Sequence, residues 1–279
     1  MFLFGALLMS CDSDDDVIDD GFQGETKEYS VQSVAGSSVE GTILFTENED
    51  GSTTVDLSLE GTEEGESYQA SINSNTAAEG GETVVTLEPI DAPTGASTTT
   101  VTELDDETTI SFEDLSNFEG HLSIYTQGEG DAVEVLAVAD LGENQLTGED
   151  ASFELASLTD QEISGTAVFE ERENGETLVS IQLDGTDQEG TYPVQIIVGP
   201  VDGAGDEVAL ILNPVDGSNG SSYSNVAQLN EDTQEGAPIT FEELVNFDGH
   251  LNVYLSEDDM ETIVAQGNIA AVSDSDGTE

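Results

Sequence analysis

Polar and hydrophobic residues alternate along most of the chain, and a period of two predicts β-strands that turn one face toward a core. The alternation is clearest at residues 54–59 and 178–183, where Val, Leu or Ile recurs at every second position. Each of these runs follows another strand-like run, and an Asp-Gly or Asn-Gly pair stands between the two. Such pairs favour the tight turn of a β-hairpin, so we expect hairpins at 41–59 and at 165–183.

Further short runs of the same kind are separated by turn residues, which predicts about seven or eight strands in each half of the chain. In the first half they are expected at 68–73, 83–87, 98–104, 122–126 and 133–139. Many short strands with almost no helix predict an all-β protein made of antiparallel β-sandwiches with Greek-key connections.

One patterned segment occurs twice, at residues 110–125 and 239–254. Near its start, Ser111 or Thr240 can cap a short helix, and the acidic residue three positions later completes a capping box. We expect the helix to stop at the glycine before the histidine, since glycine tolerates a positive φ, and a strand to begin at the histidine. The segment therefore predicts a helix-to-strand corner in each half.

The rest of the two halves aligns around this segment with nearly constant offsets. Repetition over such a length indicates a duplicated domain. We expect a first repeat at 29–149, a second at 150–272, and a disordered tail at 273–279.

Charge restricts the possible functions more than any other property of the composition. The chain holds 62 acidic residues against two basic ones, Lys27 and Arg172, and its net charge is −60. Nothing in it could neutralise phosphates, so nucleic acid is excluded as a partner. Self-repulsion of this size destabilises a compact state unless salt screens it, which indicates a halophilic or marine bacterium. An acidic surface made for one partner is the alternative.

The first eleven residues resemble a bacterial lipoprotein signal peptide. A short apolar run, too brief to span a bilayer, ends in Leu8-Met9-Ser10-Cys11, which resembles a lipobox. The resemblance implies that Cys11 is lipidated and becomes the mature N-terminus. No basic residue precedes the apolar run, and a chance cysteine after a hydrophobic start is the alternative. Because Cys11 is the only cysteine, no intrachain disulfide is available.

An acidic run follows the cysteine, made of Asp12, Ser13, Asp14, Asp15 and Asp16. It resembles the export signal that sends lipoproteins of Bacteroidetes-type bacteria to the cell surface. That implies an outer-membrane, surface-exposed location with the N-terminal lipid as the membrane contact. A retention signal and a solvated linker are the alternatives. Residues 12–28 as a whole are expected to be a flexible tether.

Each half also resembles a CHRD domain, the chordin-type module related in its sandwich to copper-zinc superoxide dismutase. The shared motifs are Gly-Thr at 41 and 165, Leu-x-Gly-Thr at 59–62 and 183–186, Tyr-Pro-Val-Gln-Ile at 192–196, Leu-x-Pro-x-Asp at 87–91 and 212–216, and Asn-Phe-acid-Gly at 117–120 and 246–249. The resemblance implies a non-enzymatic binding or structural module, with an unidentified surface protein or glycan as its partner.

The chain departs from this family where metal ligands are often found. Family members and the dismutase often carry alternating histidines on the strand after the tyrosine, which places two imidazoles on one face. Here those positions hold Ser71 and Asn73 in one half, and Gln195 and Ile197 in the other. Copper chemistry is not supported, and a degenerate dismutase-like metalloprotein is the less favoured reading.

Few other residues suggest chemistry, and no catalytic residue or cofactor is expected. His121 and His250 are the only histidines. A lone histidine at a strand start is more often a hydrogen-bonding corner residue than a ligand or base. Acidic loops offer oxygen ligands for weak Ca²⁺ binding, and a calcium-dependent adhesin is the alternative function. These loops include residues 47–50, Asp91, 202–206 and Asp216.

Overall fold

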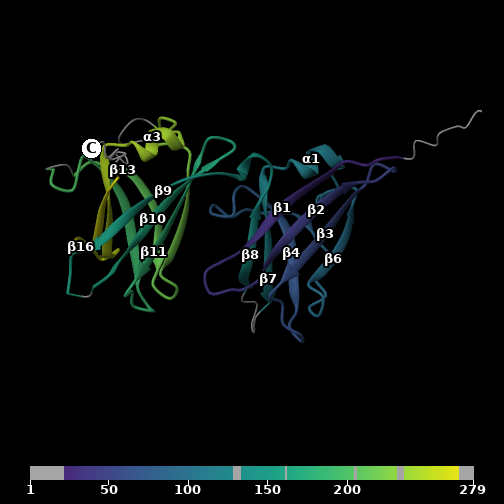
Figure 1. Cartoon of the computed structure of the whole chain (residues 1–279), viewed down its shortest axis with the longest axis horizontal. Helices are drawn as coiled ribbons and strands as arrows, with labels where there is room; N and C mark the ends of the chain where they lie inside the picture. Colours follow the sequence, from purple (N-terminus) through teal and green to yellow (C-terminus); the bar gives the residue numbers. More distant parts are fainter. Residues whose placement is uncertain (1–21, 128–132, 161, 204–205, 231–235, 270–279) are drawn as a thin grey trace, which may run out of the picture.

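The computed structural model describes residues 22–127, 133–160, 162–203, 206–230 and 236–269, and it places the two halves next to each other along the long axis of the molecule (Figure 1). Its strands pair in antiparallel fashion, so the all-β prediction is confirmed. In the part of the chain that the structure describes, no helix has the length and apolar character needed to cross a membrane.

The first half forms one antiparallel sheet of eight strands in the order β5-β4-β7-β8-β1-β2-β3-β6. Its elements are β1 (Thr26–Ser33), β2 (Glu40–Glu47), β3 (Thr53–Glu60), β4 (Tyr68–Ser74), β5 (Thr83–Thr86), β6 (Ala96–Val101), α1 (Phe112–Ser116), β7 (Gly120–Gln127) and β8 (Val133–Asp140). The hairpin expected at 41–59 is present as β2 and β3. A 3₁₀ turn, η1 (Gly142–Asn144), leads from this sheet into the second half.

The second half forms a closed barrel in the order β10-β11-β14-β13-β12-β15-β16-β9. Its elements are β9 (Leu146–Ser157), β10 (Ser164–Arg172), β11 (Thr177–Asp184), β12 (Thr191–Val198), β13 (Val208–Asp216), β14 (Ser221–Val226), α3 (Phe241–Val245), β15 (Gly249–Ser256) and β16 (Asp259–Ile269). The hairpin expected at 165–183 is present as β10 and β11.

Equivalent strands follow the same order in both halves, but only the second sheet is closed. In the barrel, Asp216 pairs with Ser221 and joins β13 to β14. The equivalent pair in the first half, Asp91 with Ala96, is an isolated bridge outside the named strands. One half is therefore an eight-stranded sheet and the other a closed barrel, where two sandwiches were expected.

Each half encloses its own hydrophobic core, and the two cores use equivalent residues. The first is built around side chains such as Phe45, Ile72 and Leu122, all with no exposed surface. The second is built around Phe169, Ile196 and Leu251, which are equally buried. Because each core is made within one half, each sheet has its own source of hydrophobic stabilisation.

The duplication extends to single hydrogen bonds. The hydroxyl of Tyr68 accepts from the backbone N–H of Glu63 at 2.9 Å, and the hydroxyl of Tyr192 accepts from that of Asp187 at 2.7 Å. These bonds hold the loop before β4 and the loop before β12 against their strands. The similarity seen in the sequence therefore reflects the same local structure in both halves.

The helix-to-strand corners are present, but the role predicted for their glycines was wrong. The helices end at Asn117 and Asn246, and Gly120 and Gly249 begin β7 and β15 without a positive φ. A Cβ on Gly120 would lie 2.2 Å from the carbonyl oxygen of Asn73, and one on Gly249 would lie 2.7 Å from that of Ile197. The ring of Phe118 or Phe247 lies similarly close, so lack of space, and not backbone conformation, requires glycine here.

Two expected boundaries differ from the observed strands. β1 begins at Thr26, so residues 26–28 of the stretch expected as a tether are paired with β2. β9 begins at Leu146, before the boundary expected at 150, because its first residue pairs with Arg172 of β10. The signal peptide, residues 12–21 of the tether, and the tail at 273–279 lie outside the described residues.

A candidate binding cleft between the two halves

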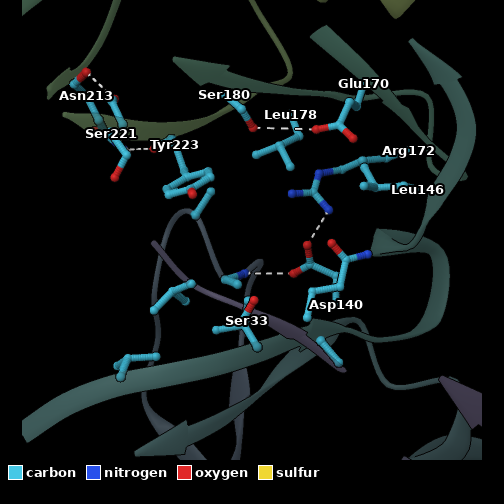
Figure 2. A pocket seen from close by; sticks show the side chains of 18 of the residues that line it. Ser33, Asp140, Leu146, Glu170, Arg172, Leu178, Ser180, Asn213, Ser221 and Tyr223 are labelled. Atoms are coloured by element: carbon cyan, nitrogen blue, oxygen red, sulfur yellow. Dashed lines mark hydrogen bonds and ion pairs between the residues drawn. The ribbon is translucent and has the colours of Figure 1, made fainter. Parts of the chain in front are cut away.

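A cleft of about 700 Å³ lies between the two halves (Figure 2). Residues of β1, β8 and the loop after β4 form one wall. Residues of β10, β11, β13 and β14 contribute to the other. Small-molecule sites in proteins commonly measure about 300–1,000 Å³, so the cleft is large enough for a small ligand.

Arg172 projects from the end of β10 into this region, and its side chain is completely buried. Its Nε donates to Oδ1 of Asn225 at 2.8 Å. Its Nη1 donates to Oδ2 of Asp140 at 2.7 Å and to the carbonyl oxygen of Asn144. Its Nη2 is buried and has no hydrogen-bond partner. A guanidinium carries five N–H donors, so the two on Nη2 are left unused.

Asp140 lies on the wall opposite Arg172 and connects three segments: β8, the loop after β4, and β10. It ends β8, and its Oδ2 receives the ion pair from Arg172. Its Oδ1 accepts a hydrogen bond from the backbone N–H of Ala77, in the loop after β4, at 2.8 Å. Charge-assisted hydrogen bonds of this kind offset the loss of hydration that burial imposes on both ions. The pair therefore links the two halves across the cleft.

The equivalent positions at the outer ends of the molecule are uncharged. Asn268 pairs with His250 as Asp140 pairs with His121, and its Oδ1 accepts from the backbone N–H of Val201 at 2.8 Å. Arg172 corresponds to Asn48 in the first half, three residues after Phe45 as Arg172 is after Phe169. The ion pair is thus confined to the junction. Sequence reasoning missed it, although a single arginine among 62 acids was a usable signal.

Glu170 lines the same cleft and is half-buried. Burial raises the pKa of its carboxyl group above the ordinary value. The hydrogen bond from Ser180 opposes this rise, the charge on Asp150 adds to it, and the charge on Arg172 opposes it. The net effect is a pKa for Glu170 above the ordinary value for a glutamate.

The two histidines make the contacts of corner residues. The Nδ1 of His121 lies 3.0 Å from the carbonyl oxygen of Asn75, and that of His250 lies 2.6 Å from the carbonyl oxygen of Gly199. A carbonyl only accepts, so Nδ1 carries the hydrogen in both rings. These bonds fix the loops after β4 and β12, as expected for a hydrogen-bonding role.

Ser71 and Asn73, the two positions compared above with metal-binding histidines, lie in a buried polar network in the first half. Asn73 receives hydrogen bonds at Oδ1 from Ser71 at 3.1 Å and from Thr83 at 2.9 Å. Its Nδ2 lies 3.4 Å from Nε2 of His121. Within the described ranges, no group of three or more His, Cys, Asp or Glu side chains is arranged to hold a metal ion.

Several acidic loop residues considered for calcium serve the turns that contain them. Oδ1 of Asp50 accepts from the hydroxyl of Ser52 at 2.6 Å and from its backbone N–H at 3.0 Å. Oδ1 of Asp216 accepts from the backbone N–H of Ser218 at 2.8 Å. These hydrogen bonds lower the pKa values of both aspartates. The carboxylates thus stabilise their own turns as Asx turns do.

No known protein family, curated protein or solved structure matches this chain. The likeness to CHRD domains rests on the sequence motifs. Cys11 and the acidic run from Asp12 to Asp16 lie outside the described residues.

Proposed function

We propose that the chain is a lipid-anchored protein displayed on the surface of a halophilic or marine bacterium. In this proposal it consists of two CHRD-like Greek-key sandwich modules and binds a partner without catalysing a reaction. The common strand order and the matching hydrogen bonds of Tyr68 and Tyr192 support two copies of one module. The lipobox resemblance at Cys11 and the acidic run after it support the location.

The cleft between the halves is the observation that carries the binding function. Both halves supply its walls, and the Arg172–Asp140 pair links those walls. Of the described residues, neither histidine belongs to the lining, and both are hydrogen-bonded to main-chain carbonyl oxygens. A cleft between two linked modules, lined by apolar and polar side chains, fits recognition of a ligand better than acid–base chemistry.

Metabolic labelling with a clickable fatty acid tests the anchor. The full chain and the variant Cys11→Ser are to be produced in a Bacteroidetes-type host. We expect label on the parent protein and none on the variant. Absence of label from both, with both proteins present at equal levels, would contradict lipid attachment.

Protease digestion of intact cells tests the surface location. Alanine substitution of Asp12, Asp14, Asp15 and Asp16 should leave the lipid label in place and protect the protein from external protease. Substitution of Asp19 and Asp20 by alanine is the matched control, and that variant should stay accessible. Equal accessibility of all three proteins would show that the acidic run is only a linker.

A further inference from the structure

We propose that the cleft between the two halves binds a neutral saccharide, with Arg172 and Glu170 at its polar end and Tyr223 as its aromatic wall. This inference rests on the proposed function, because it names the ligand of the same cleft. Three observations carry it, namely an unused donor, the local charge, and the character of the walls.

The unused donor is Nη2 of Arg172. It is buried without a hydrogen-bond partner, although Nε and Nη1 of the same group are fully engaged. Buried polar groups in native proteins are almost always paired. Arg172 lines the cleft although its side chain has no exposed surface, so an acceptor oxygen from outside the chain can pair with Nη2 once a lining side chain moves aside.

The local charge decides what kind of oxygen that is. The charge on Arg172 is already balanced by Asp140 at 2.7 Å, and Glu170 adds a second carboxylate to the same lining. A ligand carboxylate or phosphate would meet a net negative cleft in a chain of net charge −60. A ligand ammonium group has no acceptor to offer Nη2. An uncharged hydroxyl or ring oxygen can accept from Arg172 without being repelled by Glu170.

The walls combine an aromatic ring with hydrogen-bonding groups. Tyr223 is 42% exposed, and Figure 2 shows its ring directed into the cleft. The carboxylate of Glu170 and the hydroxyl of Ser180 lie together on another part of the lining, 3.5 Å apart. A sugar ring presents a C–H face to an aromatic side chain and hydroxyl groups at its edge. Tyr223 can therefore pack against the C–H face of a sugar, and Glu170 and Ser180 can hydrogen-bond to its hydroxyl groups.

Titration calorimetry with the purified full chain tests the proposal. The probes are a panel of neutral oligosaccharides and their uronic-acid counterparts, each at low and at molar salt. We expect at least one neutral oligosaccharide to bind with one-to-one stoichiometry at both salt levels. We expect its acidic counterpart to bind more weakly at low salt. Failure of every neutral probe, or stronger binding of the acidic ones at low salt, would overturn the proposal.

Variants assign the binding to the cleft. Tyr223→Ala should weaken binding by about tenfold, the size expected when an aromatic contact is lost. Met260→Ala is the matched control, since Met260 is similarly exposed on β16 and does not line the cleft. Equal affinity of Tyr223→Ala and the parent protein would place binding elsewhere and overturn the assignment.

Arg172→Lys keeps a positive charge near Asp140 but removes Nη2, so we expect it to lose binding even where it remains folded. Thermal unfolding identifies any loss of structure, and Glu170→Gln provides a second probe of the polar end. Unchanged affinity in both variants would overturn the roles assigned to these residues. Because the purified protein is used, the two proposals can be told apart. If no saccharide binds but Cys11 is labelled, the saccharide proposal is rejected and the lipid-anchored surface protein is retained.

Discussion

At the junction between the halves, β8 and β10 end in Asp140 and Arg172, whereas the equivalent outer positions hold the amides Asn268 and Asn48. Asn268 keeps the local hydrogen bond that Asp140 also makes, to a backbone N–H of the preceding loop. Unlike Asp140, Asn268 is uncharged and forms no ion pair with an arginine. The difference shows that the two copies of the fold share their internal hydrogen bonds, while the surface between them adds a buried ion pair.

The same difference limits how copies of this fold can associate. If a second molecule packed against an outer end as the two halves pack at the junction, Asn268 of one molecule would face Asn48 of the other. That contact would lack the buried ion pair and the hydrogen bonds that satisfy it. The junction is therefore a contact specific to these two halves.

The largest expected loss of stability comes from replacing Asp140 at the junction by asparagine, the residue found at the equivalent outer position. Asp140→Asn keeps an acceptor for Ala77 but leaves Arg172 buried and uncompensated. Removing one partner of a buried ion pair usually destabilises a protein by about 3–5 kcal/mol. Chemical denaturation at constant ionic strength measures the change. The mirror variant Asn268→Asp, at an exposed position, should change the free energy of unfolding by less than about 0.5 kcal/mol. Similar effects of the two variants would contradict the comparison.

A double-mutant cycle sharpens this result. Arg172→Met removes the cation, and in the double variant Asp140→Asn no longer leaves a charge behind. We expect the double variant to be more stable than the sum of the two single effects predicts, by about 1–3 kcal/mol. Additive effects would mean that the two side chains do not stabilise one another.

The two corner glycines differ in how closely a neighbouring strand approaches. An added Cβ meets a carbonyl oxygen at 2.2 Å at Gly120 and at 2.7 Å at Gly249. Each alanine variant should destabilise the protein by about 1–3 kcal/mol, with Gly120→Ala the more severe. Thermal unfolding of both variants measures the order. Gly51→Ala is a useful contrast, because there the space is open and only the positive φ opposes a side chain.

The helix caps differ in completeness. In α3, Thr240 and Glu243 form both bonds of a capping box, whereas in α1 the hydroxyl of Ser111 accepts from the N–H of Asp114. Replacement of either cap by alanine should reduce stability by about 1 kcal/mol, with the larger loss for Thr240→Ala. A larger loss at Ser111, seen by chemical denaturation, would mean that other contacts of that serine matter more.

The smallest effect concerns Glu170, whose counterpart in the first half is the uncharged Thr46. Burial raises the pKa of Glu170 in the folded protein. Its contribution to stability is therefore complete below the pKa of the unfolded chain and is lost as pH rises through the folded pKa. We expect Glu170→Gln to gain stability relative to the parent as pH increases above about 4. The gain is small because the carboxyl group is half exposed and solvent screens it. An opposite slope would show that Arg172 stabilises the charged form.

Features that depend on residues close together in the sequence could be predicted. Strand alternation and Asp-Gly or Asn-Gly pairs predicted the hairpins β2–β3 and β10–β11, which depend only on neighbouring residues. The capping residues Ser111 and Thr240 were identified for the same reason. The repeat was visible because both halves keep equivalent core positions such as Phe45 and Phe169.

Other features depend on contacts between segments that are distant in sequence. Strand alternation predicted that His121 shares a face with Ser123, yet it could not show that both residues are buried and that the loop after β4 bonds to His121. It also could not distinguish a glycine needed for conformation from one, such as Gly120, needed for the approach of another strand.

The sequence by itself determined an acidic, duplicated, all-β chain, since composition, repetition and short-range patterning require no knowledge of distant contacts. Tertiary structure alone decided that the second sheet closes into a barrel, and that Arg172 reaches Asp140 between the halves. The reason is that the energy of a buried charge depends on which group the fold brings within hydrogen-bonding distance. That arrangement also leaves Nη2 of Arg172 without a partner at the edge of the cleft.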